Sequence, residues 1–230
     1  MADFGIAIIW TQNRIMHFEI LVEDQSGKVA LDILVPRIIG EKHTFDVKSY
    51  KGVGKIPSKM SVALDASKRI LLANLPRLLA GYGKSWQEYP AVVFVVCDLD
   101  DKCLKSFRHE LIELLNTCSP RPETRFCIAI EEGEAWFLGD IPAIKKAYPK
   151  AKDAVLNAYV GDSIGGTWER LADAVYKGGS QQLSGLGWQM VGAEKSAWAE
   201  KITPHMNLDN NTSPSFNYFL GKLRELAEIV

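Results

Sequence analysis

Acidic residues follow three apolar runs of the sequence, each at the point where the run ends. The runs are FEILVED (18–24), AVVFVVCDLDD (91–101) and RFCIAIEEGE (125–134). Their carboxylates are Glu23 and Asp24, then Asp98, Asp100 and Asp101, then Glu131, Glu132 and Glu134. Clustered carboxylates repel one another unless a cation lies between them, and hard oxygen ligands suit Mg²⁺ or Mn²⁺. These residue types predict a divalent-metal site, where Asp98 and Asp100 could face one ion.

The same acids also have a simpler interpretation. At any single strand end, a carboxylate can be a solvated loop residue, or it can favour the start of a following helix through the helix dipole. Carboxylates at all three ends favour the metal site over the simpler interpretation. Both interpretations remain open from these residues alone.

The apolar runs themselves predict buried strands of a parallel sheet. They are continuous rather than alternating, which is typical of strands covered on both faces. A helical pattern follows each run, over 29–38, 104–115 and 135–148, and a further helix is predicted over 61–80, with Pro76 breaking or kinking it. Strand then helix, repeated, indicates an α/β fold. In such sheets ligands bind beyond the carboxyl ends of the strands, where the acids lie.

The last third of the chain is helical and rich in loops. Ser213 and Pro214 form a good helix start, as N-cap and first helical residue. An apolar stripe then predicts a helix face directed at the core: Phe216, Phe219, Leu220, Leu223 and Leu226. We therefore expect an N-terminal extension or extra strand over 1–16, an α/β core over 17–150, and a helical C-terminal part over 151–230 packed on the core.

Composition limits the choice of partners. The 230 residues carry a net charge of −1, which excludes a globally basic nucleic-acid binder, so nucleic-acid binding would need a local patch. Residues 41–77 hold eight basic against three acidic residues, including the loop KGVGK (51–55). This loop is not a Walker A motif. Its Lys51 and Lys55 could contact a phosphate backbone, and a solvated surface loop is an equal alternative.

Other signals are weaker. The four cysteines (97, 103, 118 and 127) match no zinc spacing, and Cys97 and Cys127 are predicted to be buried thiols. No apolar run reaches the length of a membrane span, and no signal peptide is visible, so we expect a cytoplasmic protein. The segment DLDDK (98–102) resembles the nucleophile motif of haloacid-dehalogenase-type phosphatases, although Lys102 stands where Thr or Val is expected. A small-molecule phosphatase with Asp98 as nucleophile therefore stays an alternative.

Several segments together resemble a bacterial family, domain-of-unknown-function family 4276, which is a Toprim-like group. The resemblance runs from about residue 17 to the C-terminus. It is carried most specifically by VVFVVCDLDDKCLKSFRHEL (92–111) and RFCIAIEEGEAWFLGDIPAIKKAYP (125–149), the latter through its Glu134-Ala135-Trp136 step. Two departures are modest: Asp24 stands where a glycine is often found, and Gly133 where a large apolar residue is common.

The resemblance implies a Toprim-like, Rossmann-like core: a mainly parallel sheet flanked by helices, with a helical C-terminal layer. Such cores use one glutamate after the first strand and a DxD pair after a later strand, which match Glu23, Asp98 and Asp100 here. The acid of the EAW step matches Glu134. The family is often encoded beside ABC- or AAA-type ATPases and is suspected in anti-phage defence.

The leading hypothesis is a Mg²⁺- or Mn²⁺-dependent nuclease acting on DNA or RNA, as the effector subunit of an ATPase-linked anti-phage system. Its catalytic residues would be Glu23, Asp98, Asp100 and Glu134, and Asp101 would join them as a metal ligand. Lys28, Lys51 and Lys55 would hold the phosphate backbone. The alternative is a non-catalytic Toprim-like subunit that binds an ATPase partner or nucleic acid.

Overall fold

A four-stranded, all-parallel sheet forms the centre of the molecule, with strand order β2-β1-β3-β4. The computed structural model describes residues 15–57, 69–100, 102–161 and 166–228. The strands are β1 (His17–Val22), β2 (Thr44–Ser49), β3 (Ala91–Asp98) and β4 (Thr124–Ala129). The helices that follow the first three strands are α1 (Gln25–Ile39), α2 (Leu71–Ser85) and α3 (Leu104–Asn116). The predicted α/β fold is confirmed.

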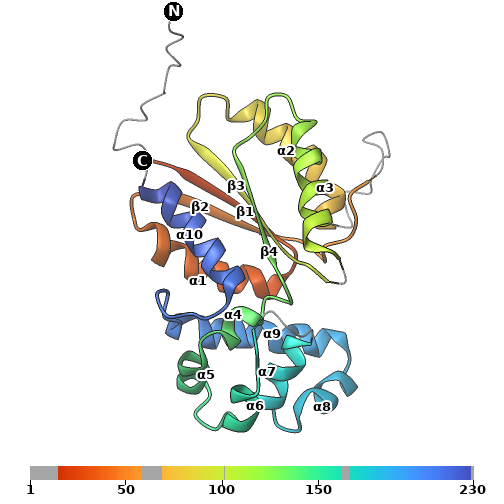
Figure 1. The fold of residues 1–230 in the computed structure, drawn as a ribbon, viewed down its shortest axis with the longest axis vertical. Coiled ribbons are helices and arrows are strands. Elements are labelled where there is room, and N and C mark those ends of the chain that lie inside the picture. The colour runs from red at the N-terminus through yellow and green to blue at the C-terminus, as the bar shows by residue number, and fades with distance from the viewer. Residues whose placement is uncertain (1–14, 58–68, 101, 162–165, 229–230) are drawn as a thin grey trace, which may run out of the picture.

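Helices cover both faces of the sheet (Figure 1). On one face, Phe18, Ile20 and Val22 of β1 pack in a core cluster with α1 and the C-terminal helix α10 (Pro214–Glu228). On the other face, Leu21 packs in a second cluster with α2 and α3. The strands are therefore apolar on both sides, which explains why their sequences are continuous apolar runs rather than alternating ones.

The chain connections place a crevice between β1 and β3. These two strands are neighbours in the sheet, but β1 leads into α1 on one face and β3 leads into α3 on the other. Helices that leave adjacent strands toward opposite faces open a space beyond the carboxyl ends of those strands. Glu23 directly follows β1, and Asp98 is the last residue of β3, so both lie at this point.

The chain after β4 is helical, and its helices lie next to the carboxyl ends of the strands, except for α10, which returns to a face of the sheet (Figure 1). They are α4 (Ala135–Leu138), α5 (Ile141–Ala147), α6 (Asp153–Asn157), α7 (Thr167–Val175), α8 (Gly179–Gly185), α9 (Trp188–Ile202), a 3-10 turn (Thr203–His205) and α10. Buried residues of α9 join the same core cluster as α1. In the described parts of the chain, no helix is long and apolar enough to cross a bilayer.

Trp136 of α4 packs against α10, and α10 in turn packs on the sheet, where Phe219 contacts Phe94 of β3 at a ring-centroid distance of 5.9 Å. The Trp136 ring stacks on Phe219 at a centroid distance of 5.1 Å, and its Nε1 donates a hydrogen bond to Ser215 Oγ. As predicted, α10 begins at Pro214, and its apolar stripe is buried. Trp136 is therefore a core residue.

The helices and strands differ from the prediction in three places. Strand β2, at the edge of the sheet, was not predicted, because its residues (TFDVKS) are half exposed and form no apolar run. The helix predicted over 135–148 is two helices, because the first ends at Leu138 with Gly139 as its C-cap, and Asp140 then caps α5 by accepting from the Ala143 N–H. Helix α2 begins at Leu71 and contains Pro76. The earlier part of the predicted 61–80 helix, like the extension over 1–14, lies outside the described residues.

Gly27 offers a test of how tightly α1 packs at the crevice. A Cβ atom at Gly27 would lie 2.6 Å from Val22 Cγ2 and 2.9 Å from Asp24 Oδ1, both too close. Gly27→Ala should therefore lower the free energy of unfolding by about 1–3 kcal/mol. In contrast, Gly221→Ala, at an exposed position of α10 with nothing within 4 Å, should raise it by up to about 1 kcal/mol. Urea denaturation measures both, and a Gly27→Ala protein as stable as the wild type would contradict the packing described.

Candidate functional site

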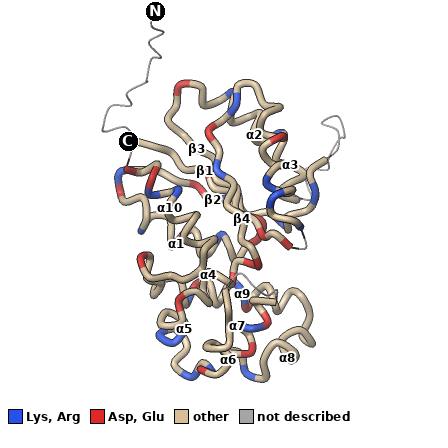
Figure 2. Tube along the Cα trace, in the orientation of Figure 1, with Lys and Arg blue, Asp and Glu red and all other residues tan. Residues whose placement is uncertain are grey.

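A small pocket lies beyond the carboxyl ends of β1, β3 and β4. Its charged lining residues are Glu23, Asp24, Asp98, Glu134 and Lys195, set among apolar side chains. Figure 2 shows acidic positions near the ends of these strands, next to the C-terminal helices. The cavity volume is about 40 Å³, which is room for roughly three water molecules. The pocket can accept an ion with a few waters, whereas an organic substrate would have to lie across its mouth.

Glu23 and Asp98 are held together by the two central strands. Glu23 Oε2 accepts a hydrogen bond from the backbone N–H of Asp98 at 2.9 Å. This bond crosses directly from the end of β1 to the end of β3. Asp24 also lines the pocket, and its carboxylate caps α1, where it accepts from the Gly27 N–H at 2.7 Å and from Ser26 Oγ at 2.6 Å. Both acids of the first strand end therefore face the pocket, and Asp24 is in addition committed to a helix cap.

Glu134 enters the pocket from the loop after β4, directly before α4. Its side chain is only 3% exposed, and Lys195 Nζ of α9 lies 3.1 Å from its Oε2. The ammonium is within ion-pair distance of this oxygen, for which no hydrogen bond is assigned among the described residues. Lys195 is the one basic side chain in the described lining of the pocket. Four carboxyl groups thus share a single ammonium group.

Burial dominates the electrostatics of these groups. It raises the pKa of Glu23 to about 7 against the opposing effect of the Asp98 N–H, and nearby Asp24 adds to the rise. Burial also raises the pKa of Glu134 to about 7, although Lys195 opposes the shift. The pKa of Asp98 is raised well above its usual range by burial and by the charge of Glu23. Burial opposes the charged form of Lys195, but the surrounding carboxylates, Glu134 first, outweigh it and raise the pKa of the lysine.

The remaining predicted acids lie elsewhere. Asp100 is exposed, adopts a φ of +50° and lies 3.3 Å from Lys102 Nζ. Asp101 lies outside the described residues. Glu131 accepts a hydrogen bond from the Tyr159 hydroxyl at 2.6 Å. Glu132 accepts from Thr167 Oγ1 and from the Trp168 N–H at the start of α7. The structure therefore brings Glu23, Asp98 and Glu134 together in a pocket that Asp24 also lines, and it leaves Asp100, Glu131 and Glu132 outside the pocket.

The donor atoms of the pocket fit a hard divalent cation by their chemistry. Carboxylate oxygens are the preferred ligands of Mg²⁺ and Mn²⁺, and Glu134 Oε2 is a buried oxygen without a hydrogen bond. The geometry is less complete: among the residues that the structure describes, no three acidic, histidine or cysteine side chains already stand where they could hold an ion. Lys195 lies beside Glu134, where an ion would otherwise be expected. An ion bound here would keep several waters, as Mg²⁺ usually does.

The match to a family model covers the whole site. A model described as a domain of unknown function, DUF4276, matches residues 22–224. The chain belongs to the DUF4276 family. No curated protein and no solved structure matches it. The family description assigns no activity, so the pocket is the main guide to what this DUF4276 member does.

Two of the predicted phosphate-binding lysines lie at the same edge of the sheet as the pocket. The loop KGVGK contacts the end of β1, because the Gly52 N–H donates to the Glu23 carbonyl at 2.7 Å. Lys51 and Lys55 on this loop are exposed. Lys28 is instead held on α1, where its Nζ donates to the Val47 carbonyl at 2.8 Å and pairs with Asp32. The loop therefore contacts the end of β1, and its role with phosphate stays a prediction.

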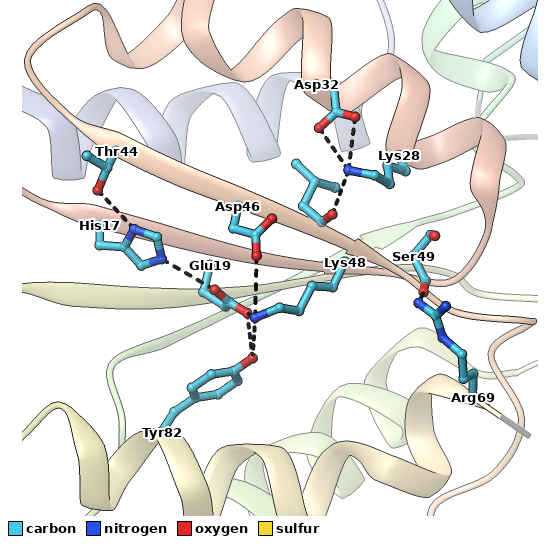
Figure 3. A network of polar contacts seen from close by, with 11 residues as sticks. His17, Glu19, Lys28, Asp32, Thr44, Asp46, Lys48, Ser49, Arg69 and Tyr82 are labelled. Carbon is cyan, nitrogen blue, oxygen red and sulfur yellow. Dashed lines mark hydrogen bonds and ion pairs between the residues drawn. The ribbon is translucent and has the colours of Figure 1, made fainter. Parts of the chain in front are cut away.

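A second buried glutamate in this DUF4276 protein, Glu19, has a polar partner for each of its carboxylate oxygens (Figure 3). Glu19 of β1 contacts Lys48 and the Tyr82 hydroxyl through Oε1, and His17 through Oε2 at 3.3 Å. Both of its oxygens therefore have partners. Glu134 has an ion pair and no hydrogen bond to the same oxygen, so it is far less well compensated.

Lys195 is the functional residue that the sequence interpretation missed. It comes 61 positions after Glu134 in the chain, so no local motif joins the two. A signal was nevertheless present, because the buried residues of α9 include Val191, Trp198 and Ile202. Lys195 falls on the same stripe, four residues after the first and three before the second. A lysine within the apolar face of a helix indicates a buried acidic partner.

The raised pKa of Glu134 predicts a pH dependence of stability. Between pH 4.5 and about 7 the folded protein binds more protons than the unfolded chain, because the pKa of this carboxyl rises to about 7 on folding. The free energy of unfolding should therefore fall as pH rises through this window, with a share of about 1–3 kcal/mol from Glu134. Urea denaturation at pH 5, 6, 7 and 8 measures the slope. Glu134→Gln should make the slope shallower. The control Glu200→Gln, at an exposed residue of the same helix as Lys195, should leave the slope unchanged. Equal slopes in the wild type and Glu134→Gln would refute the assignment.

Proposed function

We propose that this protein is a Mg²⁺- or Mn²⁺-dependent nuclease that hydrolyses phosphodiester bonds in DNA or RNA. The observation that carries the proposal is the meeting of Glu23, Asp98 and Glu134, from three strand ends, in a pocket of about 40 Å³. A pocket of this size suits an ion and its waters, and a polymer can reach it only from outside. The exposed loop with Lys51 and Lys55 beside the end of β1 supports a phosphate-bearing substrate.

In this proposal the residues have separate roles. Asp98 and Glu134 would hold the ion, with Glu23 next to it. A divalent ion bound there lowers the pKa of a coordinated water and offsets negative charge on the phosphoryl group. The pKa of Glu23, raised to about 7 by burial, suits a general base at neutral pH, which takes a proton from the attacking water. Lys51 and Lys55 would hold the flanking phosphates, and Asp100 would act on Glu23 only through its charge.

The cellular context is a further part of the proposal. An effector role in an ATPase-linked anti-phage system, with an ABC- or AAA-type ATPase partner in the cytoplasm, follows from the family resemblance described above. The structure adds no partner to this proposal.

The two aspartates of the DxD pair should behave differently. Asp98→Asn should weaken Mn²⁺ binding at least tenfold and reduce hydrolysis of a labelled oligonucleotide at least about a hundredfold, because it removes charge from the pocket. Asp100→Asn is the matched control and should stay within about threefold in both measurements. Asparagine tolerates the positive φ of this position, so the control should fold.

Calorimetry with Mn²⁺ and cleavage assays on DNA and RNA, on variants whose circular dichroism spectra match the wild type, provide the measurement. Loss of binding in Asp100→Asn with retention in Asp98→Asn would reverse the assignment. A wild-type protein that binds no Mn²⁺ at millimolar concentration would overturn the nuclease proposal.

One surface feature favours the alternative function, a non-catalytic subunit that binds a protein partner. Trp188 at the start of α9 is 79% exposed, and Leu186 and Met190 beside it are also exposed. Residues 178–193 contain no charged side chain. Protein–protein interface cores are enriched in Trp and Met and depleted in charged residues. This uncharged patch is the kind of surface that an ATPase partner would bury.

The alternative makes the opposite mutational prediction. Trp188→Ser should reduce co-purification with a co-expressed ATPase from the same genome at least tenfold, because an exposed tryptophan often dominates an interface. Asp98→Asn should leave that co-purification unchanged. Tyr218→Ser, at an exposed aromatic residue of α10, is the control. Equal recovery with Trp188→Ser and Tyr218→Ser would remove this role for the patch.

A further inference from the structure

We propose that Lys195 is a positioning residue that competes with a divalent ion for Glu134, and that an anionic phosphodiester at the pocket mouth relieves this competition by drawing the lysine away. The inference deepens the proposed function and rests on it, because it concerns uptake of the same ion. It predicts that binding of the substrate at this pocket strengthens binding of the ion.

The first support is the place that the ammonium occupies. Lys195 Nζ lies 3.1 Å from Glu134 Oε2, on a carboxylate that is almost fully buried. A divalent ion bound to the same oxygen would stand within a few ångströms of the ammonium. Two cations at that separation repel strongly wherever water is largely excluded. Lys195 and the ion therefore cannot both bind Glu134 as tightly as either would bind it alone.

The second support is the incomplete set of ligands. Within the described part of the chain, no three candidate ligands are placed to hold an ion at once. Glu23 and Asp98 are already joined by the hydrogen bond between the ends of β1 and β3. Glu134 is the remaining carboxylate of the group, and it is the one that faces Lys195. Release of Glu134 from the lysine is thus the step that would supply the missing ligand.

The third support is that Lys195 is less deeply buried than its partner. Its side chain is 17% exposed, against 3% for the side chain of Glu134. Lys48 is held differently, by contacts with Glu19 and the Tyr82 hydroxyl. A flexible lysine readily pairs with a phosphate as a point charge. Because coupling between two ligands is reciprocal, a phosphate that attracts Lys195 must also strengthen ion binding.

The decisive experiment is calorimetric titration of the full chain with Mn²⁺ at pH 8, above the pKa of about 7 of Glu23 and Glu134. Lys195→Met should bind Mn²⁺ about tenfold more tightly than the wild type. Lys195→Arg, which keeps the charge, should stay within about threefold. Lys201→Met is the matched control on the same helix, because Lys201 is exposed and lies over the Tyr148 ring at 5.6 Å. Its affinity should equal that of the wild type.

A second measurement tests the coupling with a simple phosphodiester. Millimolar dimethyl phosphate should tighten Mn²⁺ binding severalfold in the wild type and clearly less in Lys195→Gln. The glutamine variant also replaces Lys195→Met if the methionine protein does not fold. Equal tightening in both proteins would overturn the coupling.

The outcomes separate this inference from the nuclease proposal. If the wild type binds Mn²⁺ and the uncharged variants bind it equally or more weakly, the competition is refuted while the nuclease proposal stands. If neither the wild type nor the uncharged variants bind Mn²⁺, both are overturned. Tighter binding in the uncharged variants, with no effect of Lys201→Met, supports the competition.

Discussion

The excess of negative charge in one small buried pocket is the constraint on which the rest of this structure depends. Parallel strands end at the same edge of the sheet, so Glu23 and Asp98 meet there, and the loop after β4 adds Glu134. In the described lining, Lys195 is the single cation that offsets them. That lysine comes from α9, whose buried residues pack in the core cluster that also holds α1. The electrostatics of the pocket therefore require the C-terminal helices to be docked on the sheet.

Contacts with the C-terminal segment also hold the backbone that follows Glu134. Asn211 Nδ2 donates to the Trp136 carbonyl at 2.8 Å, which holds the short helix α4 that Glu134 precedes. A Cβ at Gly139 would lie 2.2 Å from Asn211 Oδ1, so only glycine permits this close approach. Asp140 ties the next turn to the backbone N–H of Asn207. Residues some 70 positions apart thus hold the backbone that follows Glu134 in one arrangement.

The sequence predicted the sheet and the location of the acids, because apolar runs and strand ends are local properties. It did not predict which acid would enter the pocket. Asp24 and Glu132 turn toward helix starts, and Asp100 turns outward at a positive φ. The direction of Asp24 is a local helix cap to Gly27, three residues later, whereas the directions of Glu132 and Asp100 depend on a helix that docks nearby and on a turn. Strand β2 was missed for a related reason: at an edge, half exposed, it needs no apolar run. Lys195 was missed because its partner is distant in the chain.

The two candidate functions meet on one helix. Trp188 and Lys195 are seven residues apart in α9, close to two turns, so they lie on nearly the same face about 10 Å apart along the axis. The first is exposed on the uncharged patch, and the second reaches the acidic pocket. Any partner that binds Trp188 therefore contacts the helix that carries the cation of the pocket. A short, regular helix moves as a unit, so displacement at the patch also displaces the ammonium. Under the two proposals, binding of a partner at Trp188 and binding of an ion at Glu134 would therefore act on the same helix.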